Sequence, residues 1–262
     1  MHKLIGVKET RAAHGLEVRG LMRRTGRFKL FALALVALLP SALKRPSYRI
    51  LFGYHIGKRV RIGLSIIDAR ECRIDDDVQI GHLNVIIGLE KLTIGDHTRI
   101  GYLNIIRGGD EVNLGRYSEI IRLNEVNSIP EPDVVNPTDP RFLLGPGSII
   151  TTGHKIDFTD RVTIGRRTII GGRNSSLWTH NRQRTRPIEI GSFAYIGSEI
   201  RIAPGGSLPS RCIVGIGSVI TSELAEEEFL IAGVPAKPVK RLTEEDQFLI
   251  ERKTRVDLPD DV

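Results

Sequence analysis

A six-residue spacing of aliphatic side chains restricts the fold of this 262-residue sequence more than any other feature. Several Ile-Gly pairs are six residues apart, and further aliphatic residues extend this spacing. The pairs begin at Ile56, Ile62, Ile80, Ile94, Ile100, Ile164, Ile190 and Ile196, and the further residues are Ile74, Leu114, Ile120, Leu144, Ile150, Ile170, Ile202, Leu208, Val214 and Ile220. A period of six fits neither an α-helix nor a simple strand. It predicts an all-β solenoid, a parallel β-helix in which each short strand turns one aliphatic side chain inward.

A longer period indicates the length of one turn. Leu-Asn pairs place Asn84, Asn104 and Asn124 at intervals of 20 residues, and the interval later shortens to 18, as from Ile196 to Val214. About eight turns, stacked about 4.7–4.9 Å apart, would account for the repeat. We expect the three asparagines to hydrogen-bond to one another along the axis, as identical polar residues in stacked strands do.

Two insertions interrupt the spacing, and insertions in a solenoid are where functional loops concentrate. One covers residues 127–142 and contains four prolines. The other covers residues 172–187 and contains Trp178, the only tryptophan, and His180. We therefore expect a helical segment over 1–53, the β-helix over 54–222, and a closing turn and helix over 223–262.

The positive charge of the chain is confined to its beginning. The net charge is +7, but residues 1–50 carry 11 Lys and Arg against 2 acidic residues, or +9, which leaves −2 for the rest. A weakly acidic body without a basic, aromatic stripe argues against nucleic-acid binding. The composition, 40% hydrophobic and 26% charged, excludes wholesale disorder and a multi-span membrane protein. Two cysteines, Cys72 and Cys212, fit a reducing compartment.

An uninterrupted apolar run covers residues 30–39, within the basic segment. It is too short to cross a bilayer, which takes about 20 apolar residues. A secretory signal would need an unusually long basic lead, and a buried packing helix is a second alternative. We favour an interfacial anchor over residues 27–50, because basic residues flank the run on both sides. This reading predicts a cytoplasmic protein held on the inner face of the cell membrane.

Three stretches of sequence give the chain a family resemblance. They are SLWTHNRQRTRPIEIGSFAYIGSEIRIAPG from Ser176, IVGIGSVITSEL from Ile213, and IAGVPAKPVKRL from Ile231. They resemble the hexapeptide-repeat acyltransferases, in particular the polysaccharide and sugar O-acetyltransferases, in which a His-bearing loop precedes such a coil. The resemblance implies a left-handed parallel β-helix, a homotrimer with its active sites between subunits, and acetyl-CoA as co-substrate, with no metal.

The resemblance also implies roles for individual residues. His180 takes the place of the catalytic base, which suits a group that must remove a hydroxyl proton near neutral pH. His154 is its rival, and Asp157 is placed to orient one of the two histidines. The expected acetyl-CoA contacts are Gly197, Ser198, Gly215, Gly217, Ser218, Lys237, Lys240 and Arg241, and the expected acceptor contacts are Trp178, Asn181, Arg182, Arg184 and Arg186.

The expected reaction is transfer of an acyl group to a hydroxyl or amino group of a sugar in bacterial surface polysaccharide or glycolipid synthesis. Two alternatives stay open at this point: a zinc enzyme on the same fold, similar to the β-helical carbonic anhydrases, and a non-catalytic scaffold. The sequence lacks the close pair of histidines that would supply two zinc ligands for the first alternative.

Finally, Thr243 and Asp246 predict a helix N-terminus, and we expect that helix to cover the last turn.

Overall fold

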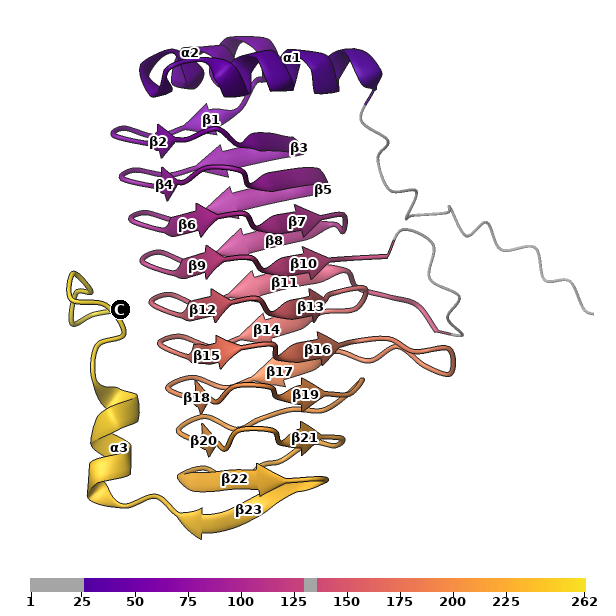
Figure 1. Ribbon diagram of the computed structural model, residues 1–262, viewed down its shortest axis with the longest axis vertical. Helices are drawn as coiled ribbons and strands as arrows, with labels where there is room; N and C mark the ends of the chain where they lie inside the picture. Colours follow the sequence, from indigo (N-terminus) through magenta and orange to yellow (C-terminus); the bar gives the residue numbers. More distant parts are fainter. Residues whose placement is uncertain (1–25, 130–135) are drawn as a thin grey trace, which may run out of the picture.

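The computed structural model describes residues 26–129 and 136–262, which form a parallel β-solenoid of about nine turns (Figure 1). The six-residue spacing is confirmed. One aliphatic side chain per turn stacks in register on the next: Ile62, Ile80, Ile100, Ile120, Ile150, Ile170, Ile196, Val214 and Ile231. All are buried, so this column is one wall of the hydrophobic core. The solenoid thus has about one turn more than the eight expected from the sequence.

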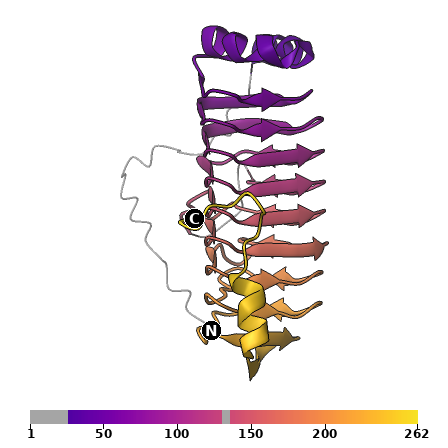
Figure 2. The same cartoon turned by 90° about the vertical axis from the view of Figure 1, so that its left-hand side faces the viewer.

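The strands form two sheets that together make the three faces of a prism, and Figure 2 shows the strands of one face stacked along the axis. The 10-stranded sheet makes one face: β2 (Arg61–Ile62), β4 (Gln79–Ile80), β6 (Arg99–Tyr102), β9 (Glu119–Arg122), β12 (Ile149–Thr152), β15 (Ile169–Arg173), β18 (Tyr195–Ile196), β20 (Ile213–Val214), β22 (Phe229–Gly233) and β23 (Ala236–Arg241). The 13-stranded sheet makes the other two faces, because its long strands β3 (Ile66–Ile74) and β5 (Val85–Ile94) bend round a corner.

Beyond that corner the 13-stranded sheet divides into two columns. The column that positions the candidate site contains β7 (Ile105–Arg107), β10 (Glu125–Asn127), β13 (Lys155–Asp157), β16 (Ser176–Trp178), β19 (Arg201–Ile202) and β21 (Val219–Ile220). The other contains β8 (Glu111–Leu114), β11 (Arg141–Leu144), β14 (Val162–Ile164) and β17 (Ile188–Ile190), and β1 (His55–Ile56) pairs with β3. Both insertions leave the solenoid at the corner between these two columns.

The asparagine ladder is present as expected. The backbone N–H and side-chain amide of Asn104 both donate to Asn84 Oδ1, at 3.0 Å, and those of Asn124 donate to Asn104 Oδ1 at 3.1 and 3.0 Å. All three asparagines are buried. Each amide thus satisfies a backbone N–H at a corner where the chain cannot continue its strand pairing.

Two helices cover the open first turn of the solenoid, α1 (Arg27–Leu38) and α2 (Ser41–Phe52) (Figure 1). Helix α1 buries Leu33 and Val36 against the turn below, and its Lys29 forms an ion pair with the buried Asp68. Its opposite side leaves Phe28 and Phe31 exposed. The apolar run therefore packs on one side only. No helix in the described part of the chain is long and apolar enough to span a membrane.

The C-terminal segment departs from expectation. Strand β23 pairs antiparallel with β22 and closes the last turn, whereas helix α3 (Glu244–Glu251) lies beside the solenoid (Figure 1). The expected N-terminus of this helix is confirmed, since Thr243 and Asp246 form a capping box. The chain then runs back along one corner, where the Arg255 guanidinium donates to the carbonyls of His97 and Tyr117 at 3.0 and 2.9 Å. The helix therefore does not cover the end.

Candidate active site

An aspartate–histidine pair lies where the second insertion leaves the solenoid. Asp157 ends strand β13, and His180 follows β16 on the next turn. His180 Nδ1 lies 2.7 Å from Asp157 Oδ2. An ionised carboxylate only accepts hydrogen bonds, so Nδ1 carries the proton and donates it. His180 Nε2 is then the basic nitrogen of the ring, and the side chain is 19% exposed.

The carboxylate of Asp157 is held by a set of donors from two neighbouring turns. Its Oδ1 accepts from the Thr159 N–H at 3.1 Å and the Thr159 hydroxyl at 2.6 Å. Its Oδ2 accepts from the Thr179 N–H and hydroxyl, at 3.0 and 3.1 Å, and from the His180 N–H at 3.2 Å. Asp157 is only 6% exposed. These bonds fix the carboxylate and, through it, the orientation of the imidazole.

The loop that carries His180 is a short hairpin. His180 and Thr185 form an isolated antiparallel bridge, and the Asn181 side chain accepts the Gln183 and Arg184 N–H groups at 2.8 and 3.0 Å. Asn136, from the first insertion, accepts the Thr185 N–H at 3.0 Å and donates to its carbonyl at 2.9 Å. The two insertions are therefore joined, and Asn181, expected to contact acceptor, has its amide oxygen engaged in shaping the turn.

A row of polar side chains runs along the outer face of the column beside Asp157. Arg107, Asn127, Asp157 and Trp178 occupy matching positions on successive strands. They border a hollow of about 190 Å³, and Trp178 is 44% exposed there. This hollow adjoins the aspartate–histidine pair and offers an aromatic wall and hydrogen-bonding groups, a combination suited to a sugar.

The three arginines of the loop differ in their surroundings. Arg182 and Arg184 are exposed at the tip of the hairpin. Arg186 lies against Gly205 of the following turn, where a Cβ would approach its Cδ to 3.0 Å. All three follow His180 within six residues in the sequence, and Arg186 packs against the body of the solenoid.

His154 occupies a structural position. Its N–H donates to Asn124 Oδ1 at 2.9 Å, its Nδ1 accepts the Ser175 N–H at 3.1 Å, and its Nε2 lies 3.0 Å from the Thr151 hydroxyl. The ring is fully buried, and burial lowers its pKa from 6.5 to about 4. His154 therefore continues the asparagine ladder as a neutral side chain, with both ring nitrogens engaged.

Replacing His154 by Asn should change the pH dependence of folding. Between pH 6.5 and 4 the unfolded chain binds a proton at this residue that the folded protein does not, so acidification favours unfolding. This one group should reduce the free energy of unfolding by up to about 3 kcal/mol as pH falls from 6.5 to 4. In His154→Asn the amide can take over the ladder bonds, and this part of the loss should disappear. Urea unfolding at pH 7.0, 5.5 and 4.5 gives the free energy of unfolding of both proteins. If that free energy fell equally with pH in the two, His154 would not be the buried neutral group described here.

The expected acetyl-CoA positions lie along a different corner. Gly197 and Ser198 follow β18, and Gly172 on the turn before has φ +65° and so little space that a Cβ would clash with the Ser198 side chain. Gly217 is exposed on the next turn, near Gly215. The Ser218 side chain is buried and its hydroxyl donates to the Gly215 carbonyl at 2.7 Å, so it belongs to the corner itself.

The expected phosphate contacts lie at the end of the solenoid. Lys237, Lys240 and Arg241 are exposed on β23. Lys240 approaches Asp246 at 3.9 Å, and the Arg241 guanidinium lies 5.2 Å from the Phe229 ring. The structure therefore groups these three cations on one strand, two to three turns from Gly197.

Several residues of the site were not among the sequence expectations. Thr159 and Thr179 hold Asp157, and Asn136 holds the His180 loop. A threonine two residues after the aspartate and another just before the histidine were the available signals. The described residues contain no group of three or more His, Cys, Asp or Glu side chains arranged for a metal ion.

Two curated proteins with related sequences are both named as O-acetyltransferases. The chain is 28% identical over 71 residues to the galactoside O-acetyltransferase of Escherichia coli (strain K12), a match covering 27% of this chain and 34% of that protein. It is 28% identical over 108 residues to a proposed lipopolysaccharide biosynthesis O-acetyl transferase, WbbJ, of the same strain, covering 34% and 55%. The matches thus span about a third and about half of these curated relatives. No protein-family model matches the chain.

Solved structures with a related fold include a hexapeptide-repeat-containing acetyltransferase of Vibrio cholerae complexed with acetyl coenzyme A. It shares 16% identity, with 84% of this chain and 92% of that chain covered and a TM-score of 0.36. The polySia-specific acetyltransferase NeuO shares 20% identity over 72% and 85% of the chains, with a TM-score of 0.41.

The six-residue repeat and the stacked parallel strands define the class of this chain as a hexapeptide-repeat β-solenoid. Over the parts given above, its sequence is similar to O-acetyltransferases.

Proposed function

We propose that the protein transfers an acetyl group from acetyl-CoA to a hydroxyl group of a sugar, with His180 as general base. The observation that carries this proposal is the hydrogen bond from His180 Nδ1 to the buried Asp157, which leaves Nε2 as the proton acceptor on a partly exposed ring. The names of the curated relatives support O-acetylation as the reaction.

The chemistry proceeds by addition and elimination. The acceptor hydroxyl loses its proton to His180 Nε2 as its oxygen attacks the thioester carbonyl carbon. The tetrahedral intermediate collapses with cleavage of the carbon–sulfur bond, and the imidazolium returns its proton to the leaving thiolate, giving the acetylated sugar and CoA. Asp157 keeps the proton on Nδ1 throughout and stabilises the imidazolium that forms.

The placement of the candidate groups argues for a homotrimer. Strands β16 and β19 begin at the corner that holds Gly197 and Ser198, and β16 ends at the loop that holds His180. In one chain these groups therefore lie at opposite edges of one face. A neighbouring subunit could bring its own glycine corner to His180, and its backbone N–H groups could then bind the oxyanion. Lys237, Lys240 and Arg241 would bind the CoA phosphates.

The acceptor site is proposed at the hollow beside Asp157. Trp178 would stack on the sugar ring, and Arg182, Arg184 and Arg186 would bind anionic groups of the glycan. Such a site suits an acceptor of bacterial surface polysaccharide or glycolipid synthesis. Two free, buried cysteines, Cys72 and Cys212, fit synthesis on the reducing, cytoplasmic side of the membrane.

A thiol-release assay tests the reaction. Purified protein is incubated with acetyl-CoA and a panel of galactosides, acidic glycans and amino sugars, and free CoA is measured against an acceptor-free control. We expect release with a hydroxyl acceptor and an alkali-labile acetyl ester in the product. Failure to bind acetyl-CoA in calorimetry would overturn the proposal, and an alkali-stable amide in the product would change it to N-acetylation.

The exposed side of α1 and α2 is proposed to contact the membrane surface. The large apolar side chains exposed on these two helices are Phe28, Leu30, Phe31, Leu35, Leu38, Leu43, Ile50 and Leu51. Both helices belong to the basic part of the sequence, which carries a net charge of +9 over residues 1–50. Apolar burial and attraction to anionic lipids act together in such a surface.

Replacing Phe31 and Leu35 together by Gln should release the protein from anionic vesicles. Both side chains are more than half exposed, so folding should not change. We expect binding to fall at least about tenfold, since each residue loses contact with the acyl region. Co-sedimentation with vesicles containing phosphatidylglycerol measures this. The matched control is the same change at Phe248 and Leu249, an exposed Phe and Leu on α3; equal binding by both variants would contradict the contact.

A further inference from the structure

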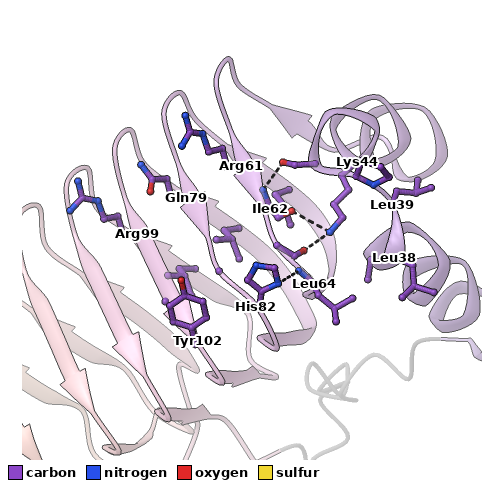
Figure 3. A pocket seen from close by; sticks show the side chains of 18 of the residues that line it. Leu38, Leu39, Lys44, Arg61, Ile62, Leu64, Gln79, His82, Arg99 and Tyr102 are labelled. Carbon is purple, nitrogen blue, oxygen red and sulfur yellow. Dashed lines mark hydrogen bonds between the residues drawn. The ribbon is translucent and has the colours of Figure 1, made fainter.

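A large groove lies at the opposite end of the solenoid from the closing strands, under the junction of α1 and α2 (Figure 3). It has a volume of about 820 Å³ and lies along strands β2, β4 and β6. Pockets that bind small organic ligands measure about 300–1,000 Å³. The groove belongs to a different face and different turns from His180, so the proposed acyl transfer does not use it.

One wall of the groove is a row of hydrogen-bond donors. Arg61, Gln79 and Arg99 occupy matching positions on the three strands and point the same way (Figure 3). Two strand spacings put the Arg61 and Arg99 positions roughly 10 Å apart. A phosphate group above Gln79 could therefore reach both guanidinium groups. Arg99 also pairs with Asp257 at 2.8 Å, whereas Arg61 has no side-chain partner among the described residues.

The opposite wall adds two further donors. His82 Nδ1 accepts the Leu64 N–H at 3.1 Å, so a neutral His82 carries its proton on Nε2. Tyr102 stacks parallel to His82, with ring centroids 6.1 Å apart. Both side chains line the groove (Figure 3).

A buried ammonium group gives the groove its positive potential. Lys44 of α2 is 3% exposed, and its Nζ donates to the carbonyls of Ile62, at 3.2 Å, and Gly63. No carboxylate pairs with it among the described residues. A buried charge without a countercharge is costly, and an anionic ligand would reduce that cost. Glu119 is the single carboxylate in the lining, against Lys44, Arg61 and Arg99.

The remaining part of the groove is apolar. Ala37, Leu38 and Leu39 line it where α1 ends, and Leu38 is 71% exposed. Leu38 also belongs to the exposed side of the helices proposed to contact the membrane. An alkyl chain could thus pass from the donor row over Leu38 and Leu39 to that surface.

We propose that this groove binds a lipid phosphate, with the phosphate between Arg61 and Arg99 and the alkyl chain over Leu38 and Leu39. The site goes beyond the proposed acyl transfer. It also differs from general attraction to an anionic membrane, because it requires one arginine pair in a defined groove and would bind a single amphiphile in solution.

Octyl phosphate below its micelle concentration is the probe for this site. Calorimetry with the full-length protein compares it with inorganic phosphate and with octanol. We expect octyl phosphate to bind at least about tenfold more tightly than either, because only it satisfies both ends of the groove. Equal affinity for inorganic phosphate would remove the lipid component, and equal affinity for octanol would remove the phosphate component; either result overturns the proposal.

Two variants locate the binding. Arg61→Gln should weaken the binding of octyl phosphate about tenfold or more. The control is Arg73→Gln, at an exposed arginine of β3 that pairs with Asp75, and it should bind octyl phosphate as the natural protein does. Leu38→Gln should weaken the binding of octyl phosphate and leave the binding of inorganic phosphate unchanged. Sedimentation velocity on the same proteins tests the other occupant of such a groove: dissociation of an oligomer in Arg61→Gln would make this face a subunit interface and would overturn the lipid site.

Discussion

The His180→Gln variant should lose about 10²–10⁴-fold in kcat for acetyl transfer, the contribution that a positioned general base makes. Glutamine keeps a polar side chain of similar reach but cannot accept the hydroxyl proton. The acceptor then attacks the thioester without a base. The KM for acetyl-CoA should change little, because the donor is expected to be held by the glycine corner and by the cations of β23 and not by the His180 side chain. Initial rates of CoA release at saturating donor measure the effect.

His154→Asn is the matched histidine control. It removes an imidazole of the same protein while keeping the ladder bonds to Asn124 and Ser175. We expect kcat within about threefold of the natural protein, the margin left by one conservative change remote from the reacting atoms. Wild-type activity in His180→Gln, together with a large loss in His154→Asn, would reverse the assignment of the base.

The fold could be predicted almost completely from the sequence because its information is local and repeated. Ile62, Ile80 and Ile100 each fill the same position one turn apart, so a single six-residue pattern fixes strand, corner and inward direction at once. The ladder of Asn84, Asn104 and Asn124 followed from the same argument. Neighbouring turns impose the register, and few long-range contacts need to be guessed.

The C-terminal segment could not be predicted in this way. Its helix was expected over the last turn, but the Arg255 side chain is buried against the carbonyls of His97 and Tyr117, more than 130 positions earlier in the chain. No periodicity links such residues. The contact depends on a corner where His97 and Tyr117 adopt positive φ and leave carbonyl groups for an outside donor.

The candidate site was only partly visible in the sequence. His180 and Asp157 could both be named as candidates, because one lies in an insertion and the other one turn before it, but the sequence left open which histidine Asp157 orients. The role of His154 could not be separated from theirs, since a ladder position and a catalytic position both contain an isolated histidine. The difference lies in burial and in the partners of the ring nitrogens, which only the stacked turns define.

The Asp157→Asn variant should lose both activity and stability, because the carboxylate accepts hydrogen bonds on both oxygens. If the new amide nitrogen faces Thr159, it opposes the N–H and hydroxyl that now donate to Oδ1. If it faces His180, the imidazole must accept at Nδ1 and carry its proton on Nε2. Either arrangement leaves donors without an acceptor, at about 1–3 kcal/mol of unfolding free energy, because the Thr179 N–H and hydroxyl and the His180 N–H now donate to Oδ2. The second arrangement also removes the base.

Kinetics and spectroscopy separate these two effects of Asp157→Asn. A fall in kcat of about 10²–10⁴-fold is expected where the wrong tautomer dominates, and ¹⁵N NMR of labelled histidine should then show the proton of His180 on Nε2. Thr159→Val is the matched control, since it removes one donor to Oδ1 but leaves the bond to His180 Nδ1. It should lower stability and preserve the tautomer and kcat. If Thr159→Val lost as much activity as Asp157→Asn, Asp157 would act by shaping the loop and not by orienting the base.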